Sequence, residues 1–399
     1  MYSIGTTIYI LFYTKDYILI ATTFYMKKEE IIVKFSKALF NEHKRKNAVT
    51  INNISSTLIE ASLTSSFVNE SCKSTEEISK SQIIYRKLDS TINETEFAFR
   101  KNANKFLNLL KIYSRNRKFI LSFDTTEEPF YGKLNKGENN LYLHDLTYEA
   151  KGTKYCYKYL TLAITCDNGA RYILDGIILK RGDYIEDYVY DMIKAVKEKI
   201  KIECVLFDRS FGWSVIWKLQ ELKVNYMVFW KKQGSWYKKH LDKLKDGKFC
   251  EINRSYKYPR DKTNYKIESE FVLIKQHNYE GKKYDWIFAT NLNLKSAKKY
   301  VMRYKKRWGI ETIFRVTDDI RIYTTSTNPL IRYFLFMFTC FVYNVWKFFQ
   351  SFIGEDFTLA NFSTNMNKFM IEKEMIKPKH YSDFIKIFNK YKLSAQTGR

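Results

Sequence analysis

The sequence predicts an α/β core in the middle of the chain, where short apolar runs alternate with stretches of helical period. An Asp-Asn-Gly run at 167–169 separates two strand-like runs and predicts a hairpin between them. The expected strands are 118–124, 155–166, 171–179, 202–208 and 224–230, and the expected helices are 183–200 and 212–222. This order indicates an antiparallel start followed by parallel strands that are joined by helical crossovers.

Two of the expected strands end in an acidic residue. The run KFILSFD ends at Asp124, and the run IECVLFD ends at Asp208. If these strands are parallel neighbours, their ends lie roughly 4.8 Å apart across the sheet, at the edge where α/β sheets usually carry function. Carboxylates that close repel each other unless cations neutralise them, and ligands that are all oxygen favour Mg²⁺ or Mn²⁺ over zinc. Asp124 and Asp208 are therefore predicted metal ligands.

The segments around this core differ in composition. Helical patterning covers Ile31–Phe40 and Phe97–Ile112, and Ser74 with Glu77 fits a capping box. Small basic helical domains often bind DNA, although plain packing modules are at least as common. The expected division is an unassigned segment 1–25, a helical, DNA-binding domain 26–115, a core 116–230 and 291–349, a basic β-rich insertion 231–290, and a basic C-terminal segment 350–399.

The charge of the chain suits a polyanionic partner. The formal net charge is +25, and residues 231–307 contain 22 Lys or Arg against 8 Asp or Glu, with aromatic residues interleaved. Basic side chains neutralise phosphates, and flat rings stack on exposed bases. A lysine-rich composition also follows from an AT-rich genome, so charge alone leaves both interpretations open.

The six cysteines have no metal-binding spacing and are expected to be small core residues in a reducing compartment. The apolar start of the chain is interrupted by Lys15 and Asp16 and lacks a signal-peptide cleavage site. The apolar run Phe334–Trp346 is too short to span a bilayer and predicts a buried helix. These features predict a soluble cytoplasmic protein without a membrane partner.

A third acid follows the basic stretch. Tyr304, Arg307 and Glu311 are three and four residues apart, so on a helix they share one face. On spacing alone, an ordinary ion pair between Arg307 and Glu311 is the favoured interpretation. Their position between a basic stretch and an apolar helix favours a functional role in addition to that ion pair.

Three segments give the chain a family resemblance: FDTTEEPFYGK (123–133), VLFDRSFGWSVIWKL (205–219) and YKKRWGIETIFR (304–315). They resemble those of DDE transposases from prokaryotic insertion sequences, in the group whose RNase H-like core is split by a β-rich insertion. The resemblance covers roughly residues 115–349. It implies a mixed five-stranded sheet with flanking helices, and a triad of Asp124, Asp208 and Glu311 that holds two Mg²⁺ or Mn²⁺ ions.

The same group carries a Tyr-Arg-Glu-Lys signature, which Tyr304, Arg307 and Glu311 match. The Lys position is Asp318 here, so the DNA contact made by that Lys is in doubt, and Arg315 lies near the same helical face as a substitute. The resemblance thus predicts DNA contacts for Tyr304, Arg307, Arg315 and Arg209.

The implied function is that of an insertion-sequence transposase. Such an enzyme binds double-stranded DNA at the element ends, cleaves it by metal-assisted hydrolysis and joins the released 3′-OH to target DNA. Joining two ends implies a homodimer when assembled on DNA. Two alternatives stay open: an RNase H-like nuclease without strand transfer, and a catalytically inactive element copy that only binds DNA.

Overall fold

The computed structural model describes residues 51–73, 81–88, 92–113, 118–133, 137–166 and 170–372. The chain divides into two compact units. The first contains Met1–Ser90, Ile320–Thr324 and Phe352–Arg399, and the second contains Thr91–Asp319 and Thr325–Ser351. Several expected features lie outside the described residues: segment 1–25, the helix at Ile31–Phe40, the capping box of Ser74 and Glu77, the turn at 167–169, and residues 373–399.

The described part of the first unit is helical. Its helices are α3 (Ile51–Leu63), α4 (Val68–Ser71), α5 (Ser81–Lys87) and α13 (Leu359–Glu372). Residues 320–324 join this unit through specific contacts: the Ser62 hydroxyl donates a 2.7 Å hydrogen bond to the Ile320 carbonyl, and Phe67 forms a parallel bridge with Tyr323. The DNA-binding role expected of this helical region stays a prediction.

The second unit is built on a mixed sheet. Its strands are β1 (Phe119–Phe130), β2 (Leu143–Ala150), β3 (Thr153–Thr165), β4 (Arg171–Ile178), β5 (Ile202–Phe207), β6 (Tyr226–Phe229), β7 (Phe249–Arg260), β8 (Thr263–Tyr279) and β9 (Lys282–Thr290). Among the described residues the strand order is β2-β3-β1-β5-β6-β9-β8-β7, and β4 also pairs with β3. The accompanying helices are α6 (Ile92–Tyr113), η1 (Glu138–Tyr142), α7 (Ile185–Lys197), α8 (Trp213–Glu221), α9 (Trp236–Leu241), α10 (Ala297–Lys305), α11 (Trp308–Asp318) and α12 (Pro329–Ile353).

Strands β4, β3, β1, β5 and β6 form the expected core. β3 pairs antiparallel with β1 and β4, whereas β5 pairs parallel with β1 and β6. Parallel neighbours require crossovers, which α7 and α8 supply. The apolar face of α7, with Val189, Met192 and Ile193, is buried. The predicted mixed α/β fold with an antiparallel start is confirmed.

Two features of the core differ from expectation. β1 continues to Phe130 instead of ending at Asp124, because its polar second half pairs with β3 along its whole length. β2 was not expected at all, and Asp145 lies within it. β2 pairs with β3 at only a few positions. Its mostly polar sequence lacks the apolar alternation that marks a half-buried strand, so no sequence pattern predicted it.

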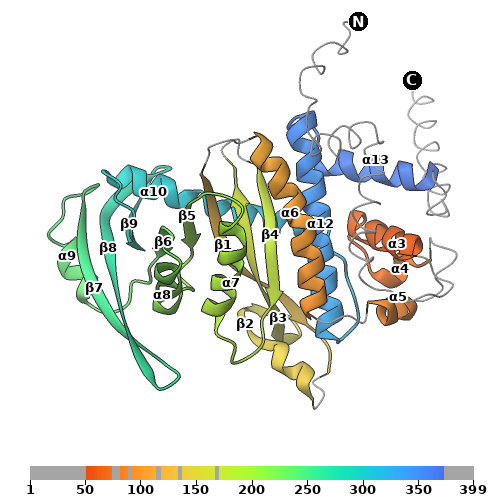
Figure 1. Ribbon diagram of the computed structural model, residues 1–399, viewed down its shortest axis with the longest axis horizontal. Helices are drawn as coiled ribbons and strands as arrows, with labels where there is room; N and C mark the ends of the chain where they lie inside the picture. Colours follow the sequence, from red (N-terminus) through yellow and green to blue (C-terminus); the bar gives the residue numbers. More distant parts are fainter. Residues whose placement is uncertain are drawn as a thin grey trace, which may run out of the picture. The chain divides into compact units, whose positions relative to one another are not determined.

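Residues 249–290 extend the sheet. β7 and β8 form a long hairpin, and β9 pairs antiparallel with β8 and with β6 (Figure 1). All three strands lie within residues 231–290, the stretch that was expected to be rich in β-strands. One buried cluster joins the core to these strands and to α10; among its members are Ile120, Leu206, Val272, Phe288 and Tyr300.

Two long helices pack beside β4 (Figure 1). Arg100 of α6 forms an ion pair with Asp175 of β4, so α6 belongs with the sheet and not with the helical domain expected to end at 115. The helix expected at 97–112 is present, but its apolar face covers the core sheet. The Asn344 side chain on α12 accepts a 2.8 Å hydrogen bond from the Ile173 N–H and donates one of 2.7 Å to the Ile173 carbonyl.

Helix α12 contains the apolar run that predicts a buried helix, and this prediction is confirmed. By length and composition α12 is the one helix of the described residues that is able to cross a membrane. However, 89% of its most apolar window is buried within the protein, as in the core helix of a globular domain. Asn344 fits that environment because the backbone of Ile173 in β4 satisfies its amide.

The buried acid Asp175 predicts a pH dependence of stability. Burial raises its pKa from 3.8 to about 7, and Arg100 opposes the shift. The folded protein therefore holds a proton that the unfolded chain releases between these two pH values. We expect this carboxyl to contribute stability below pH 3.8 that is lost as the pH rises to about 7. Urea unfolding of the parent and of Asp175→Asn between these pH values measures this contribution. A difference in the free energy of unfolding that does not change with pH would contradict a raised pKa for Asp175.

Candidate active site

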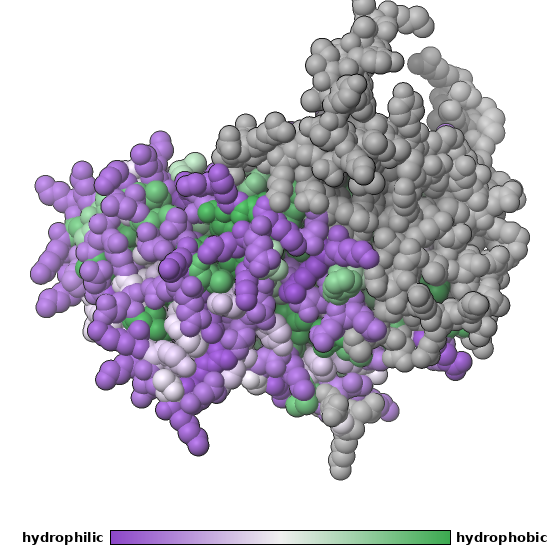
Figure 2. Space-filling view, in the orientation of Figure 1, coloured by the Kyte–Doolittle hydropathy of each residue, from purple (hydrophilic) through white to green (hydrophobic). Residues whose placement is uncertain are grey.

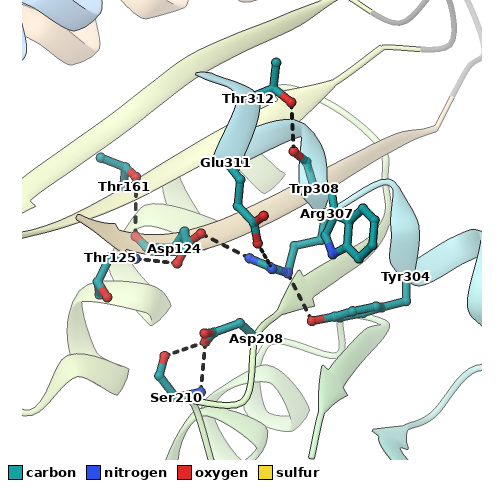
Figure 3. Close-up of polar contacts among 10 residues, drawn as sticks. All are labelled: Asp124, Thr125, Thr161, Asp208, Ser210, Tyr304, Arg307, Trp308, Glu311 and Thr312. Atoms are coloured by element: carbon teal, nitrogen blue, oxygen red, sulfur yellow. Dashed lines mark hydrogen bonds and ion pairs between the residues drawn. The ribbon is translucent and has the colours of Figure 1, made fainter. Parts of the chain in front are cut away.

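Two phenylalanines align the strands that carry the predicted acids. Phe123 and Phe207 are fully buried on neighbouring parallel strands, and their rings stack with centroids 5.2 Å apart and 4° between their planes. Successive side chains in a strand point to opposite faces of the sheet. The residues that follow, Asp124 and Asp208, are thereby directed to the face where Arg307 lies (Figure 3).

Asp124 lies within β1, just past the end of its pairing with β5. Its Oδ1 accepts a 2.9 Å hydrogen bond from the Thr125 N–H, and its Oδ2 accepts one of 3.0 Å from Arg307 Nη1. Burial raises the pKa of Asp124 to about 6; Arg307 opposes this shift, whereas the charges of Asp208 and Glu311 add to it. These charges act on Asp124 because the structure gathers all three predicted acids in one place.

Asp208 is the first residue after β5, as expected. Its Oδ1 accepts a 2.9 Å hydrogen bond from the Ser210 N–H and a second one from the Ser210 hydroxyl. Asp and Ser two residues apart commonly close such side-chain turns. The neighbouring Arg209 is exposed, and its guanidinium lies 5.4 Å from the centroid of the Phe229 ring.

Glu311 reaches the other acids from α11. Tyr304, Arg307 and Glu311 were expected on one helix, but residues 306–307 form a turn between α10 and α11. Ser296 caps α10, because its hydroxyl accepts a hydrogen bond from the Lys299 N–H. Glu311 lies in the first turn of α11, and its side chain is 54% exposed.

Tyr304 holds the Arg307 side chain through a hydrogen bond. Its ring is buried against the rings of Phe229, Trp286 and Phe288, with the nearest centroids 5.2 Å away. Its hydroxyl accepts a 3.1 Å hydrogen bond from Arg307 Nε. Tyr304 therefore anchors a guanidinium within the protein.

Arg307 connects the triad. Its side chain is 6% exposed, and it forms ion pairs with Asp124 through Nη1 and with Glu311 through Nη2 (Figure 3). Burial alone would lower the pKa of Arg307, but Tyr304, Asp124 and Glu311 raise it above its usual range. A permanently charged guanidinium thus neutralises two of the three acids.

The donor set fits a hard divalent cation in its chemistry. All three acids offer oxygen, which Mg²⁺ and Mn²⁺ prefer, and the charges of Asp208 and Glu311 add to the effect of burial in raising the pKa of Asp124. Within the residues that the structure describes, however, no group of three or more His, Cys, Asp or Glu is arranged to hold a metal ion. Arg307 bridges Asp124 and Glu311 instead. Metal binding by the triad therefore remains a prediction.

The four predicted DNA contacts fall into two classes. Tyr304 and Arg307 are buried, and each side chain has hydrogen-bond partners within the protein, so their contact with DNA stays a prediction. Arg209 and Arg315 are exposed, and Arg315 lies one turn beyond Glu311 on α11. Asp318, at the position of the signature Lys, is exposed at the end of the same helix.

Ser210 and the stacked phenylalanines are parts of the site that the sequence interpretation missed. The Asp-Arg-Ser order after β5 was a usable signal, because Ser two residues after Asp favours a side-chain turn. Phe123 and Phe207 immediately precede the two Asp residues, but nothing in the sequence shows that their rings meet.

Comparison with solved structures found similarity to transposase complexes. A cryo-EM structure of the piggyBac transposase synaptic complex with hairpin DNA matches at 14% identity and a TM-score of 0.49, over 88% of this chain and 79% of that chain. The Mos1 transposase paired-end complex with the left transposon end matches at 14% identity and a TM-score of 0.18, over 46% of this chain and 59% of that chain. No curated protein matches.

A family match covers the site itself. The family described as "Transposase DDE domain" matches residues 121–345, which is more than half of the chain. The matched span includes Asp124, Asp208 and Glu311, whose charges converge around Arg307. The predicted family is confirmed: the chain belongs to the transposase DDE domain family.

Proposed function

We propose that this chain is the transposase of an insertion sequence, which binds the element ends, cleaves the DNA and joins the new 3′-OH to target DNA. One observation carries the proposal: Asp124 and Asp208 follow stacked residues on adjacent parallel strands, and Arg307 links Asp124 to Glu311. Three acids on separate elements are thereby concentrated at one end of the β1–β5 pair, in a family of transposases.

The triad residues would hold two divalent ions, Mg²⁺ or Mn²⁺. Such ions supply Lewis-acid stabilisation of the attacking and leaving oxygens of a phosphodiester. The residues of this chain orient the ligands: Ser210 fixes the carboxylate of Asp208, and the Thr125 N–H fixes that of Asp124. No covalent enzyme intermediate is needed, so no Ser or Tyr nucleophile is part of the proposal.

We propose that exposed basic side chains bind the DNA. Arg209 and Arg315 lie beside the triad and form no ion pair with a carboxylate of the described residues, so they are positioned to neutralise phosphates. The face in Figure 2 is largely hydrophilic over β7, β8 and α9. Exposed lysines within and next to α9 include Lys231, Lys232, Lys238, Lys239 and Lys243. Binding through such residues weakens steeply with salt, because counterions are released from DNA.

Two further parts of the proposal concern assembly and location. Since two element ends are joined in one reaction, we propose a homodimer on DNA. We also propose that the protein acts in the cytoplasm, associated with the nucleoid, where its DNA substrate lies.

The proposal is tested with the purified chain, a labelled duplex that carries an end of its own element, a target duplex, and Mg²⁺ or Mn²⁺. Metal-dependent release of a 3′-OH, followed by its appearance in the target strand, is the expected result. Cleavage without joined product would favour a nuclease without strand transfer. Binding of the element end without cleavage under either metal would identify an inactive DNA-binding copy.

Ser210 should position Asp208 for this reaction. Ser210→Ala removes the hydroxyl that bonds to Asp208 but keeps the backbone hydrogen bond. Loss of one hydrogen bond to a charged group is expected to lower the single-turnover cleavage rate by roughly tenfold. The thermal midpoint should change little, because Ser210 is exposed. Ser210→Thr, which keeps a hydroxyl, should retain most of the rate, and equal loss in both variants would contradict a positioning role.

A further inference from the structure

Arg307 uses every nitrogen of its guanidinium within the site. Nη1 contacts Asp124 Oδ2 at 3.0 Å, Nη2 contacts Glu311 Oε1, and Nε donates to the Tyr304 hydroxyl at 3.1 Å. The side chain is 6% exposed. This is therefore an internal cation held in a fixed geometry, unlike a loose surface ion pair.

The same contacts occupy the oxygens that a metal ion needs. Both oxygens of Asp124 accept hydrogen bonds, one from Thr125 and one from Arg307, and Glu311 is engaged through Oε1. A divalent cation binds carboxylate oxygens directly, so it competes with the guanidinium for Asp124 and Glu311. Asp208 has no ion pair with Arg307 among the described residues, and its partner is Ser210.

A guanidinium that leaves the carboxylates needs another anion. Its planar fork matches phosphate as well as carboxylate, because both accept two parallel N–H bonds. A DNA phosphodiester at the triad would supply such an anion beside Arg307. Burial makes an unpaired charge costly, so the guanidinium is not expected to leave without a replacement.

We propose that Arg307 is a displaceable counter-ion that couples DNA binding to metal loading: it holds Asp124 and Glu311 in the DNA-free protein and moves to a DNA phosphate when a divalent cation takes its place. This inference rests on the proposed function, since it assumes that the triad binds metal. It assigns Arg307 a positioning role in the free protein that differs from a permanent DNA contact. By linkage, DNA must raise the affinity for metal by the same factor by which metal raises the affinity for DNA.

The test is a titration of the full chain with Mn²⁺ in the absence of DNA. Binding is measured as the decrease in the EPR signal of free Mn²⁺. Arg307→Gln should bind Mn²⁺ about tenfold more tightly or better, equivalent to about 1.4 kcal/mol. Arg307→Lys, which keeps one charge but cannot bridge two acids, should lie between the parent and Arg307→Gln. The matched control is Arg315→Gln, which removes the same charge two turns further along, on α11, but breaks no ion pair with the triad; we expect less than about threefold change.

A second arm repeats the titration with the element-end duplex bound. DNA should tighten Mn²⁺ binding in the parent by about tenfold or more, and by clearly less in Arg307→Gln, whose competitor is already gone. Circular dichroism and thermal unfolding establish that each variant is folded, and Arg307→Lys keeps the test decisive if Arg307→Gln does not fold.

The outcomes separate the inference from the proposed function. Equal or weaker Mn²⁺ binding by folded Arg307→Gln and Arg307→Lys, in a parent that binds Mn²⁺ and cleaves DNA, would overturn the counter-ion role and leave the transposase proposal standing. Failure of every protein to bind Mn²⁺, with and without DNA, would overturn the metal-dependent function as well. If Arg315→Gln raised the affinity for Mn²⁺ as much as Arg307→Gln does, the effect would be one of general charge. That result would refute specific competition between Arg307 and Mn²⁺ for the carboxylates.

Discussion

Asp208→Asn is expected to abolish metal-dependent DNA cleavage, lowering the single-turnover rate by roughly three orders of magnitude or more. The amide keeps the size of the side chain and an acceptor oxygen for Ser210 but loses the negative charge that a divalent cation requires. Asp124→Asn and Glu311→Gln should have effects of the same order, because the three acids act as one charged unit. Their effects should also be far from additive, as is usual for residues that share one function.

Measurements of DNA affinity and of folding in each variant distinguish a loss of catalysis from a general loss of structure. Each variant should retain the parent's affinity for the element end within a few fold. The matched control is Asp145→Asn, since this carboxylate is 84% exposed on β2 and pairs only with Arg181 among the described residues. It should leave the cleavage rate unchanged. Full activity of Asp208→Asn, or equal loss in Asp145→Asn, would place the active site elsewhere.

Phe207→Ala is expected to lower the free energy of unfolding by roughly 3–5 kcal/mol. Phe207 is fully buried, stacks on Phe123 and contacts Phe211 edge-on. Its removal leaves a cavity beneath the strand ends that carry Asp124 and Asp208. We therefore expect the cleavage rate to fall as well, because small displacements of catalytic groups are costly.

Urea unfolding of Phe207→Ala and of Phe97→Ala provides the comparison. Phe97 is a ring of the same size on α6 but is 59% exposed, so its removal should change the free energy of unfolding by no more than about 0.5 kcal/mol. Phe207→Leu, which refills most of the cavity, should recover much of the stability and rate. A loss below about 1 kcal/mol in Phe207→Ala would show that the ring pair does not hold the strands together.

The core of the fold and the acids of the site were predictable because their signals are local. Buried strands appear as short apolar runs, and the acid at the end of each run, Asp124 or Asp208, is visible without any knowledge of pairing. The amphipathic period of α7 likewise follows from its own residues. The spacing of Arg307 and Glu311 predicted an ion pair between them, which the structure contains.

What the sequence did not reveal depends on contacts between distant segments. The polar second half of β1 is a strand because β3 pairs with it, and Glu127 and Glu128 find partners in Lys158 and Arg332. No local pattern supplies those partners. For the same reason α6 was assigned to the wrong domain, since its packing on β4 involves a partner far along the chain.

The role of Arg307 shows the same limit within the site. Its contact with Asp124 spans 183 residues, so the sequence could suggest only the neighbour four residues away. The predicted DNA contact followed from the family resemblance, whereas the structure holds the guanidinium between two acids. The burial of Tyr304 could not be foreseen for the same reason, because its aromatic neighbours come from β6 and β9.

The most direct test of the account asks whether the triad touches the metal, by replacing Asp124, Asp208 and Glu311 in turn with Cys. A thiolate is a softer ligand than a carboxylate and discriminates against Mg²⁺ more than against Mn²⁺. We predict that the Cys variants fail to cleave DNA in Mg²⁺ and recover part of the rate in Mn²⁺, whereas Ala variants at the same positions recover nothing. Cleavage in Mg²⁺ by all three Cys variants at the parental rate would contradict the claim that these residues hold the catalytic metal.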